Sequence, residues 1–239
     1  MTRRELLASG LAGAAALASR GKAMAEARTI RESVDHLLLG TRDLDQGIAW
    51  LEARTGVKAQ PGGSHPGVGT RNALVSLGGR QYLEIIAPDP AQSAFNFDID
   101  LRALAAPRLV TWAISTPDVD AAAAAARRHG LEVFGPRDGS RTRPDGSVLQ
   151  WRSAGVKASF AEADVDPVPF FIEWASSSHH PSSDAPPGCR LVDIGIAGPD
   201  PVKLKAALAS LGVDATVAKA AHARLSATLD TPKGRVTLE

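Results

Sequence analysis

One order of elements occurs three times along this chain: a strand, a capped helix, then further strands. The first unit opens with a short apolar run rich in branched residues, 34–40, which predicts a buried strand. A helix is predicted over 43–54 and is ended by Gly56. Strands over 72–77 and 81–87 follow, separated by a Gly-Gly turn.

The second and third units repeat this order with clear helix-start signals. A strand over 108–114 precedes Thr116-Pro117-Asp118, an N-cap signal with proline at the first helical position. After an alanine-rich helix, a turn at Pro144-Asp145-Gly146 and a closing strand over 169–175 complete the second unit. The third begins with a strand over 191–196 and a helix capped by Asp200-Pro201.

A unit with one helix covers only one face of its sheet, so such units are expected to pair. The predicted fold is α+β: tandem βαβββ modules form a curved mixed sheet with a cleft over 28–180. The stretch 175–188, which is rich in Ser, His and Pro, is interpreted as a linker, with the boundary between domains at 181–190. An additional βαβββ unit spans 191–239. That third unit is expected to pack either on the first pair or on the same unit of a second chain, as a homodimer.

Residues 1–27 have the character of a cleaved export signal. Arg3-Arg4 precedes the apolar stretch 6–18, and Ala23-Met24-Ala25 forms a small-x-small cleavage site. The start resembles a twin-arginine signal, which predicts a periplasmic or exported protein. The alternative is an amphipathic or disordered N-terminus. The apolar stretch is short for a bilayer span, so no stable membrane anchor is expected.

Composition excludes several functions. Net charge is +1, aromatic residues make up 5%, and no basic stretch is interleaved with aromatic residues. Nucleic-acid binding is therefore not expected. With Cys189 as the single cysteine, neither an intramolecular disulfide nor a thiolate zinc site can form.

Three titratable residues stand inside apolar strands: His36, Glu84 and Glu173. An ionised glutamate in such a strand is costly unless it is paired or bound to metal. Glu173 is read as holding in the second unit the place of Glu84 in the first, which favours a shared cause. The alternatives are a core histidine for His36, and ion pairs with cations such as Arg71 or Arg152 for the glutamates.

Tandem βαβββ units with a histidine in the first strand and a glutamate in the closing strand resemble the vicinal oxygen chelate superfamily. Several segments more closely resemble its glyoxalase-like domain branch, over about residues 33–180. These segments are Val34-Asp35-His36-Leu37, His65-Pro66-Gly67, Gly69-Thr70-Arg71-Asn72-Ala73-Leu74, Tyr82-Leu83-Glu84-Ile85-Ile86-Ala87-Pro88-Asp89-Pro90 and Pro169-Phe170-Phe171-Ile172-Glu173-Trp174.

The resemblance implies one divalent metal ion in the cleft that chelates substrate oxygens. The ligand positions of the superfamily fall on His36, Glu84, Thr111 and Glu173. Thr111 departs from the pattern, because a histidine or glutamate is usual there. One imidazole and two carboxylates suit Zn, Mn, Ni, Fe or Mg and favour Lewis-acid chemistry over oxygen activation.

The sequence thus predicts a metal-dependent isomerase or lyase acting on a small oxygenated molecule. Glu84 or Glu173 would serve as the base that moves a proton beside a carbonyl. Arg71, His65 and Thr111 are the candidate substrate-binding residues; a surface arginine, a turn histidine and a plain strand threonine are their alternatives. The competing function is a binding or sequestering protein that uses the same cleft without turnover.

Overall fold

The computed structural model describes residues 28–143, 145–157, 160–162 and 164–239. The export signal predicted for 1–27 lies outside the described residues. Within the described ranges, no helix is long and apolar enough to cross a membrane.

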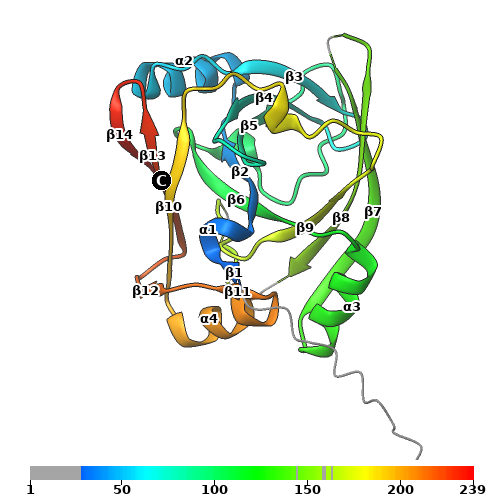
Figure 1. The fold of residues 1–239 in the computed structure, drawn as a ribbon, viewed down its shortest axis with the longest axis vertical. Helices are drawn as coiled ribbons and strands as arrows, with labels where there is room; N and C mark the ends of the chain where they lie inside the picture. Colours follow the sequence, from blue (N-terminus) through cyan, green and yellow to red (C-terminus); the bar gives the residue numbers. More distant parts are fainter. Residues whose placement is uncertain (1–27, 144, 158–159, 163) are drawn as a thin grey trace, which may run out of the picture.

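A curled mixed sheet of eight strands forms the centre of the molecule (Figure 1). Its two modules meet where their first strands, β2 and β6, pair antiparallel. In each module this first strand also pairs in parallel with the last, as β2 does with β5 and β6 with β9. The strands in spatial order are β3 (Gln60–His65), β4 (Thr70–Ser76), β5 (Tyr82–Pro88), β2 (Val34–Gly40), β6 (Arg108–Ser115), β9 (Phe170–Trp174), β8 (Val148–Lys157) and β7 (Glu132–Thr142). The predicted fold class is confirmed.

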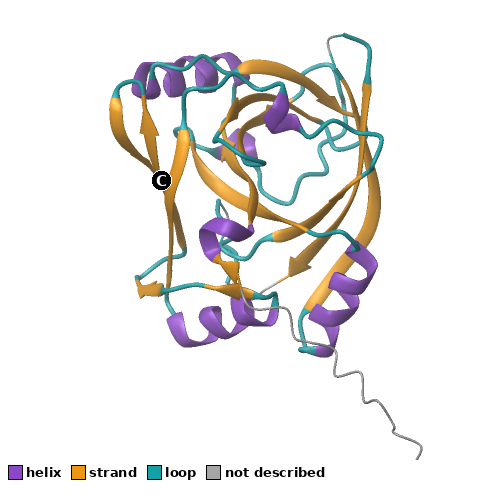
Figure 2. Cartoon of the chain, viewed as in Figure 1, coloured by secondary structure: helices purple, strands orange, loops and turns teal. Residues whose placement is uncertain are grey.

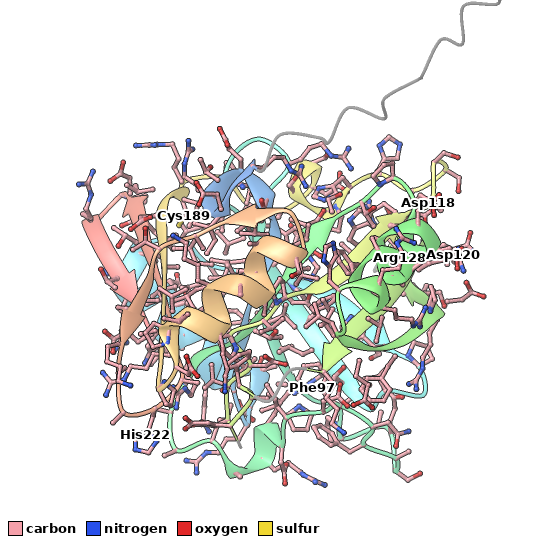
Figure 3. All side chains as sticks on the ribbon, turned by 90° about the horizontal axis from the view of Figure 1, so that it is seen from below. Phe97, Asp118, Asp120, Arg128, Cys189 and His222 are labelled. Atoms are coloured by element: carbon pink, nitrogen blue, oxygen red, sulfur yellow. The ribbon has the colours of Figure 1, made fainter. Side chains whose placement is uncertain are left out.

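The two module helices lie outside the curl of the sheet (Figure 2). Helix α2 (Leu44–Thr55) is capped by Asp43, whose side chain accepts the Gln46 N–H at 2.8 Å, and ends at Gly56 with a φ of 78°. Helix α3 (Val119–Arg128) is capped in the same way by Asp118. Figure 3 shows Asp118 and Asp120 at the outer edge of the molecule, at the start of α3.

Strand β3 was not predicted, because its sequence, Gln60 to His65, reads as a loop rich in Gly and Pro. It forms nevertheless, because it lies at the end of the strand order and pairs only with β4. Proline and glycine are tolerated in such an edge strand, since one side of it needs no backbone partner. The curl of the sheet brings β3 into contact with β7, the strand at its other end. The guanidinium of Arg141 on β7 donates to the carbonyl of Gly62 across this gap.

The third unit packs on the paired modules of its own chain, which is the first of the two arrangements considered. A single core joins Leu37 of β2 and Trp112 of β6 to Leu191 and Leu225 of this unit. Its strands are ordered β12-β10-β13-β14, so its first strand lies between two others and does not border the last. Its elements are β10 (Arg190–Gly198), α4 (Pro201–Ser210), β11 (Val213–Asp214), β12 (Val217–Lys219), β13 (Arg224–Thr231) and β14 (Gly234–Leu238).

Two further segments attach this unit to the modules. The start of the described chain, β1 (Arg28–Thr29) and the single-turn helix α1 (Ile30–Ser33), pairs through β1 in parallel with β11. The stretch 181–190 contains the 3-10 turn η2 (Pro181–Ser183) and binds the sheet, since Pro186 O accepts the Ser76 N–H at 2.9 Å. The dimer alternative stays a prediction.

Because the core is shared, we expect the third unit to unfold together with the modules. Leu204→Ala in α4 removes a side chain that is 1% exposed and should cost about 2–5 kcal/mol of unfolding free energy. Urea unfolding followed by circular dichroism should show one transition at a lower midpoint. The matched control is Val202→Ala on the same helix, where the side chain is 78% exposed and the change should be within about 0.5 kcal/mol. Two separate transitions in the wild-type chain would contradict this expectation.

Candidate active site

A cavity of about 140 Å³ lies on the concave face of the sheet, mainly over the first module. Its polar wall comes from β2, β4, β5, the end of β3 and Arg141 of β7, and its apolar wall is largely aromatic and comes from both modules. The lining residues are His36, Leu38, His65, Val68, Thr70, Asn72, Tyr82, Glu84, Ile86, Phe97, Arg141, Trp151, Phe170, Ile172 and Trp174.

His36 is held by its neighbour Asp35. A register shift between β2 and β6 falls at this point and leaves Asp35 as an extra residue opposite Ile114 and Ala113. The carboxylate of Asp35 lies 2.8 Å from His36 Nδ1. Because a carboxylate accepts only, Nδ1 carries the proton and Nε2 is left facing the cavity. The imidazole also stacks on Tyr82, with ring centroids 4.6 Å apart.

Asp35 is buried and carries two further hydrogen bonds. Trp174 Nε1 donates to its Oδ2 at 3.2 Å, and His180 Nε2 lies 3.2 Å from the same oxygen. Burial by itself would raise the pKa of Asp35, but the hydrogen bonds from His180 and His36 outweigh it and hold the pKa far below its usual value. The carboxylate is therefore a permanent anion that fixes the ring of His36.

Glu84 lies opposite His36 and is 6% exposed. Its Oε2 is 3.7 Å from His36 Nε2, and its Oε1 is 3.7 Å from His65 Nε2. Asn72 Nδ2 donates to Glu84 Oε1 at 2.9 Å and lies 3.2 Å from His65 Nε2. The ion pairs with Arg71 or Arg152 considered for Glu84 are therefore replaced by an amide hydrogen bond.

His65 is a neutral imidazole in this arrangement. Its Nδ1 lies 2.8 Å from Thr70 Oγ1, and its Nε2 faces Asn72 and Glu84. Burial lowers the pKa of His65, and the charge of Glu84 only partly opposes this. The expected position of His65 at the site is thus found, although its sequence context indicated a loop.

Glu173 does not reach the cavity, contrary to the predicted metal set. Its Oε2 accepts the Val119 N–H at 2.8 Å, at the start of α3 on the convex face. Leu38 lies five residues before Asp43, the cap of α2, and Ala113 lies five residues before Asp118, the cap of α3, so the two hold equivalent places in their modules. Leu38 pairs with Glu84, whereas Ala113 pairs with Phe170. Phe170 therefore holds the place of Glu84, and the repeat alignment made from the sequence placed Glu173 on the wrong side of the strand.

Two predicted substrate-binding residues also lie outside the cavity. Arg71 alternates with Thr70 and Asn72 along β4 and so projects to the opposite face. Thr111 lines a neighbouring pocket of about 630 Å³ over the second module, together with Phe170 and Asp166.

Four residues of the site were not identified from the sequence: Asp35, Asn72, Arg141 and His180. Asp35 and Asn72 flank residues that were singled out, and strand alternation would have favoured Asn72 over Arg71. His180 was assigned to the linker, yet it is buried against Asp35. No local pattern marks Arg141, because β7 reaches the cavity only through the curl of the sheet.

The predicted set of metal donors is not assembled here. His36 Nε2 and the Glu84 carboxylate are suitable donors, but Glu173 lies on the other face and Thr111 lines the next pocket. Across 28–143, 145–157, 160–162 and 164–239, no three His, Cys, Asp or Glu side chains are placed to hold one metal ion. The predicted donor set therefore does not fit the implied metal, and no catalytic step is assigned to it.

Comparison with known proteins places these observations in a family. Residues 34–212 match the family described as a glyoxalase-like domain. A hypothetical protein from Staphylococcus aureus has a similar structure, at 15% identity over 80% of this chain and 87% of that chain, with a TM-score of 0.62. At this identity the likeness shows the fold alone.

Two methylmalonyl-CoA epimerases are structurally more distant. That of Streptomyces coelicolor, in complex with 2-nitronate-propionyl-CoA, is 22% identical over 62% of this chain and 97% of that chain, with a TM-score of 0.44. That of Mycobacterium tuberculosis is 18% identical over 62% and 90%, with a TM-score of 0.40. No curated protein matches the sequence.

The position of Glu173 predicts a purely structural role. Glu173→Gln weakens a charge-assisted bond at the N-terminus of α3 and should lower the unfolding free energy by about 1 kcal/mol. Urea denaturation measures this change. Glu132→Gln, at an exposed position on β7, is the control and should be neutral. Unaltered stability of the Glu173 variant would show that the bond to α3 contributes nothing.

Asp166 predicts a pH dependence of stability. Burial, opposed by the Val168 N–H and assisted by Asp98, raises the pKa of Asp166 from 3.8 to about 6. The folded protein therefore binds this proton more tightly than the unfolded chain does. The contribution of Asp166 to the free energy of unfolding is complete below pH 3.8 and is lost as the pH rises through 6. Asp166→Asn should remove this loss, raising stability at pH 8 by at most about 3 kcal/mol and little at pH 4. Thermal unfolding at both pH values tests this, with exposed Asp193→Asn as the control; an equal effect at both would contradict it.

Proposed function

The chain belongs to the glyoxalase-like domain family, and from this membership and its cavity we propose that it is an enzyme of proton transfer. It acts on a small oxygenated molecule as an isomerase or a lyase. The observation that carries the proposal is the Asp35–His36 pair, which presents an imidazole nitrogen to the cavity opposite Glu84.

His36 Nε2 has the geometry of a general base. Asp35 fixes the tautomer in which this nitrogen carries a lone pair, and Tyr82 holds the plane of the ring. A substrate carbon beside a carbonyl group would give its proton to Nε2 and form an enolate. The imidazolium that results lies between two carboxylates, Asp35 at 2.8 Å and Glu84 at 3.7 Å, which stabilise its charge.

In the second half of the reaction the imidazolium of His36 gives this proton up. In an isomerase the imidazolium gives it back at the neighbouring carbon, and His36 is neutral again. In a lyase the enolate expels a leaving group, which takes the proton from the imidazolium. Asn72 keeps the Glu84 carboxylate in place throughout, because its amide donates to Oε1 at 2.9 Å.

The size and walls of the cavity limit the substrate. Its volume of about 140 Å³ is close to that of a cavity of about 150 Å³ that holds benzene. The reacting part of the substrate therefore has on the order of six to eight non-hydrogen atoms. The aromatic wall, which includes Trp151, Trp174 and Phe170, offers apolar surface to the part of the substrate that carries no charge.

The superfamily resemblance implies four ligand positions for one divalent metal ion. His36 and Glu84 occupy two of the four ligand positions, and the second module supplies Thr111 and Phe170 at the equivalent places. Proton transfer by His36 is therefore proposed without a step through a metal. Elemental analysis of the purified protein tests the difference, because a stoichiometric divalent metal would restore the metal-dependent function.

The alternative function is binding without turnover. It is favoured by the second module, where a phenylalanine replaces the carboxylate and a threonine replaces the strong ligand. The exported location is a proposal that rests on residues 1–27 alone.

Hydrogen–deuterium exchange tests the proposed chemistry without knowledge of the product. The protein is incubated in D₂O with small hydroxy-ketones, 2-oxo acids and aldehydes, and loss of the proton signal beside the carbonyl is followed by NMR. We expect exchange with at least one compound. His36→Gln should slow it by about 10²–10⁴-fold, since this is the usual contribution of a general base. Glu84→Gln should also slow it, because it removes one of the two carboxylates that stabilise the imidazolium.

Glu173→Gln is the matched control, because the same substitution is made on the opposite face of the sheet and should leave exchange within about threefold of wild type. Exchange that persists in His36→Gln would contradict the assignment of the base. An absence of exchange with every compound would favour the binding protein.

A further inference from the structure

Arg141 is a buried cation in the wall of the cavity that the proton-transfer mechanism does not use. We propose that it binds the carboxylate of the substrate, so that the protein acts on a small organic acid anion. This assignment rests on the proposed function in that it concerns the same cavity, and it names the class of molecule that enters.

Arg141 is buried and has no direct carboxylate partner among the described residues. Its side chain is 4% exposed, and one guanidinium nitrogen donates to the carbonyl of Gly62. Among the residues that the structure describes, no Asp or Glu oxygen lies within 4.0 Å of the Arg141 guanidinium. Arg143, two residues further along the chain, pairs with Asp184. Buried charges in proteins are normally paired, whereas the carboxylates of Glu84 and Asp184 act on Arg141 only from beyond ion-pair distance.

Arg141 also lies in the same cavity as the candidate base. It lines the cavity together with Glu84 and His36, and its charge acts on His65 and Tyr82 as well as on Glu84. A ligand that enters meets one fixed cation, and a guanidinium binds a carboxylate through two parallel hydrogen bonds.

Because Gly62 has no side chain, it leaves space for the guanidinium of Arg141. A Cβ at Gly62 would lie 2.5 Å from Arg141 Nη1 and 2.4 Å from Asn72 Oδ1. Any larger residue at this position would displace the guanidinium or the amide that holds Glu84. The absence of a side chain on β3 thus positions both the cation and the carboxylate of the site.

The electrostatics of the cavity agree with an anionic ligand. Burial lowers the pKa of Arg141, and the negative charge of Glu84 only partly opposes this. A ligand carboxylate would add a second negative charge and stabilise the guanidinium. With its carboxylate at Arg141, a small acid of the size given above places its remaining atoms toward His36 and Glu84.

Isothermal calorimetry with the whole chain tests the proposal. The probes are lactate, pyruvate and benzoate, each compared with its primary amide, which has nearly the same shape without the charge. We expect at least one acid to bind, and we expect its amide to bind with an affinity at least roughly 30-fold lower. Arg141→Gln should weaken binding of the acid by about 100-fold and leave the amide unaffected.

Three variants separate this proposal from a structural role and from the proposed function. Arg143→Gln should bind the acid as wild type does. Gly62→Ala, which keeps the charge but crowds the guanidinium, should weaken the acid selectively, with folding checked by circular dichroism. His36→Gln should lose deuterium exchange yet keep acid binding, so failure of the chemistry is distinguishable from failure of recognition. Equal binding of acid and amide, unchanged affinity in Arg141→Gln, or no binding of any acid would overturn the proposal.

Discussion

The antiparallel pairing of β2 with β6 is the constraint on which the rest of this structure depends. It joins two βαβββ modules through their first strands, so the sheet continues from one module into the other and curls around a cavity. The same pairing contains the register shift at Asp35. An extra residue at that point lets Asp35 bind the imidazole of His36 while both remain buried. Assembly of the fold and orientation of the candidate base thus have one origin.

Strand alternation then decides which side chains meet. Because successive residues point to opposite faces, an error of one residue exchanges the cavity for the helix side. Asn72 and Arg71 are neighbours in β4, yet only Asn72 touches Glu84. Glu173 is the neighbour of Ile172, which lines the cavity, but its carboxylate accepts the Val119 N–H at the start of α3 instead.

The charges inside the molecule fall into two groups. Asp35 is buried and fully provided with hydrogen bonds from His36, His180 and Trp174, so it acts as a fixed anion behind the site. Glu84 and Arg141 face the cavity with fewer partners, which is costly in a folded chain unless a ligand supplies the missing contacts. Such incomplete pairing is typical of side chains kept for binding or chemistry.

The sequence by itself predicted the fold class, the approximate starts of the two module helices, and the candidates His36, Glu84 and His65. It placed the cap of the second helix at Thr116, whereas the structure places this cap at Asp118. It could not determine the strand β3, whose Gly and Pro residues carry no strand signal. Nor could it determine the face on which Glu173 lies, since that requires the register between β6 and β9. The tertiary structure alone decided that His180 and Arg141 join the site. Both come from segments remote in the chain, and only the closure of the curled sheet, together with the space left by Gly62, brings Arg141 to the cavity beside Glu84.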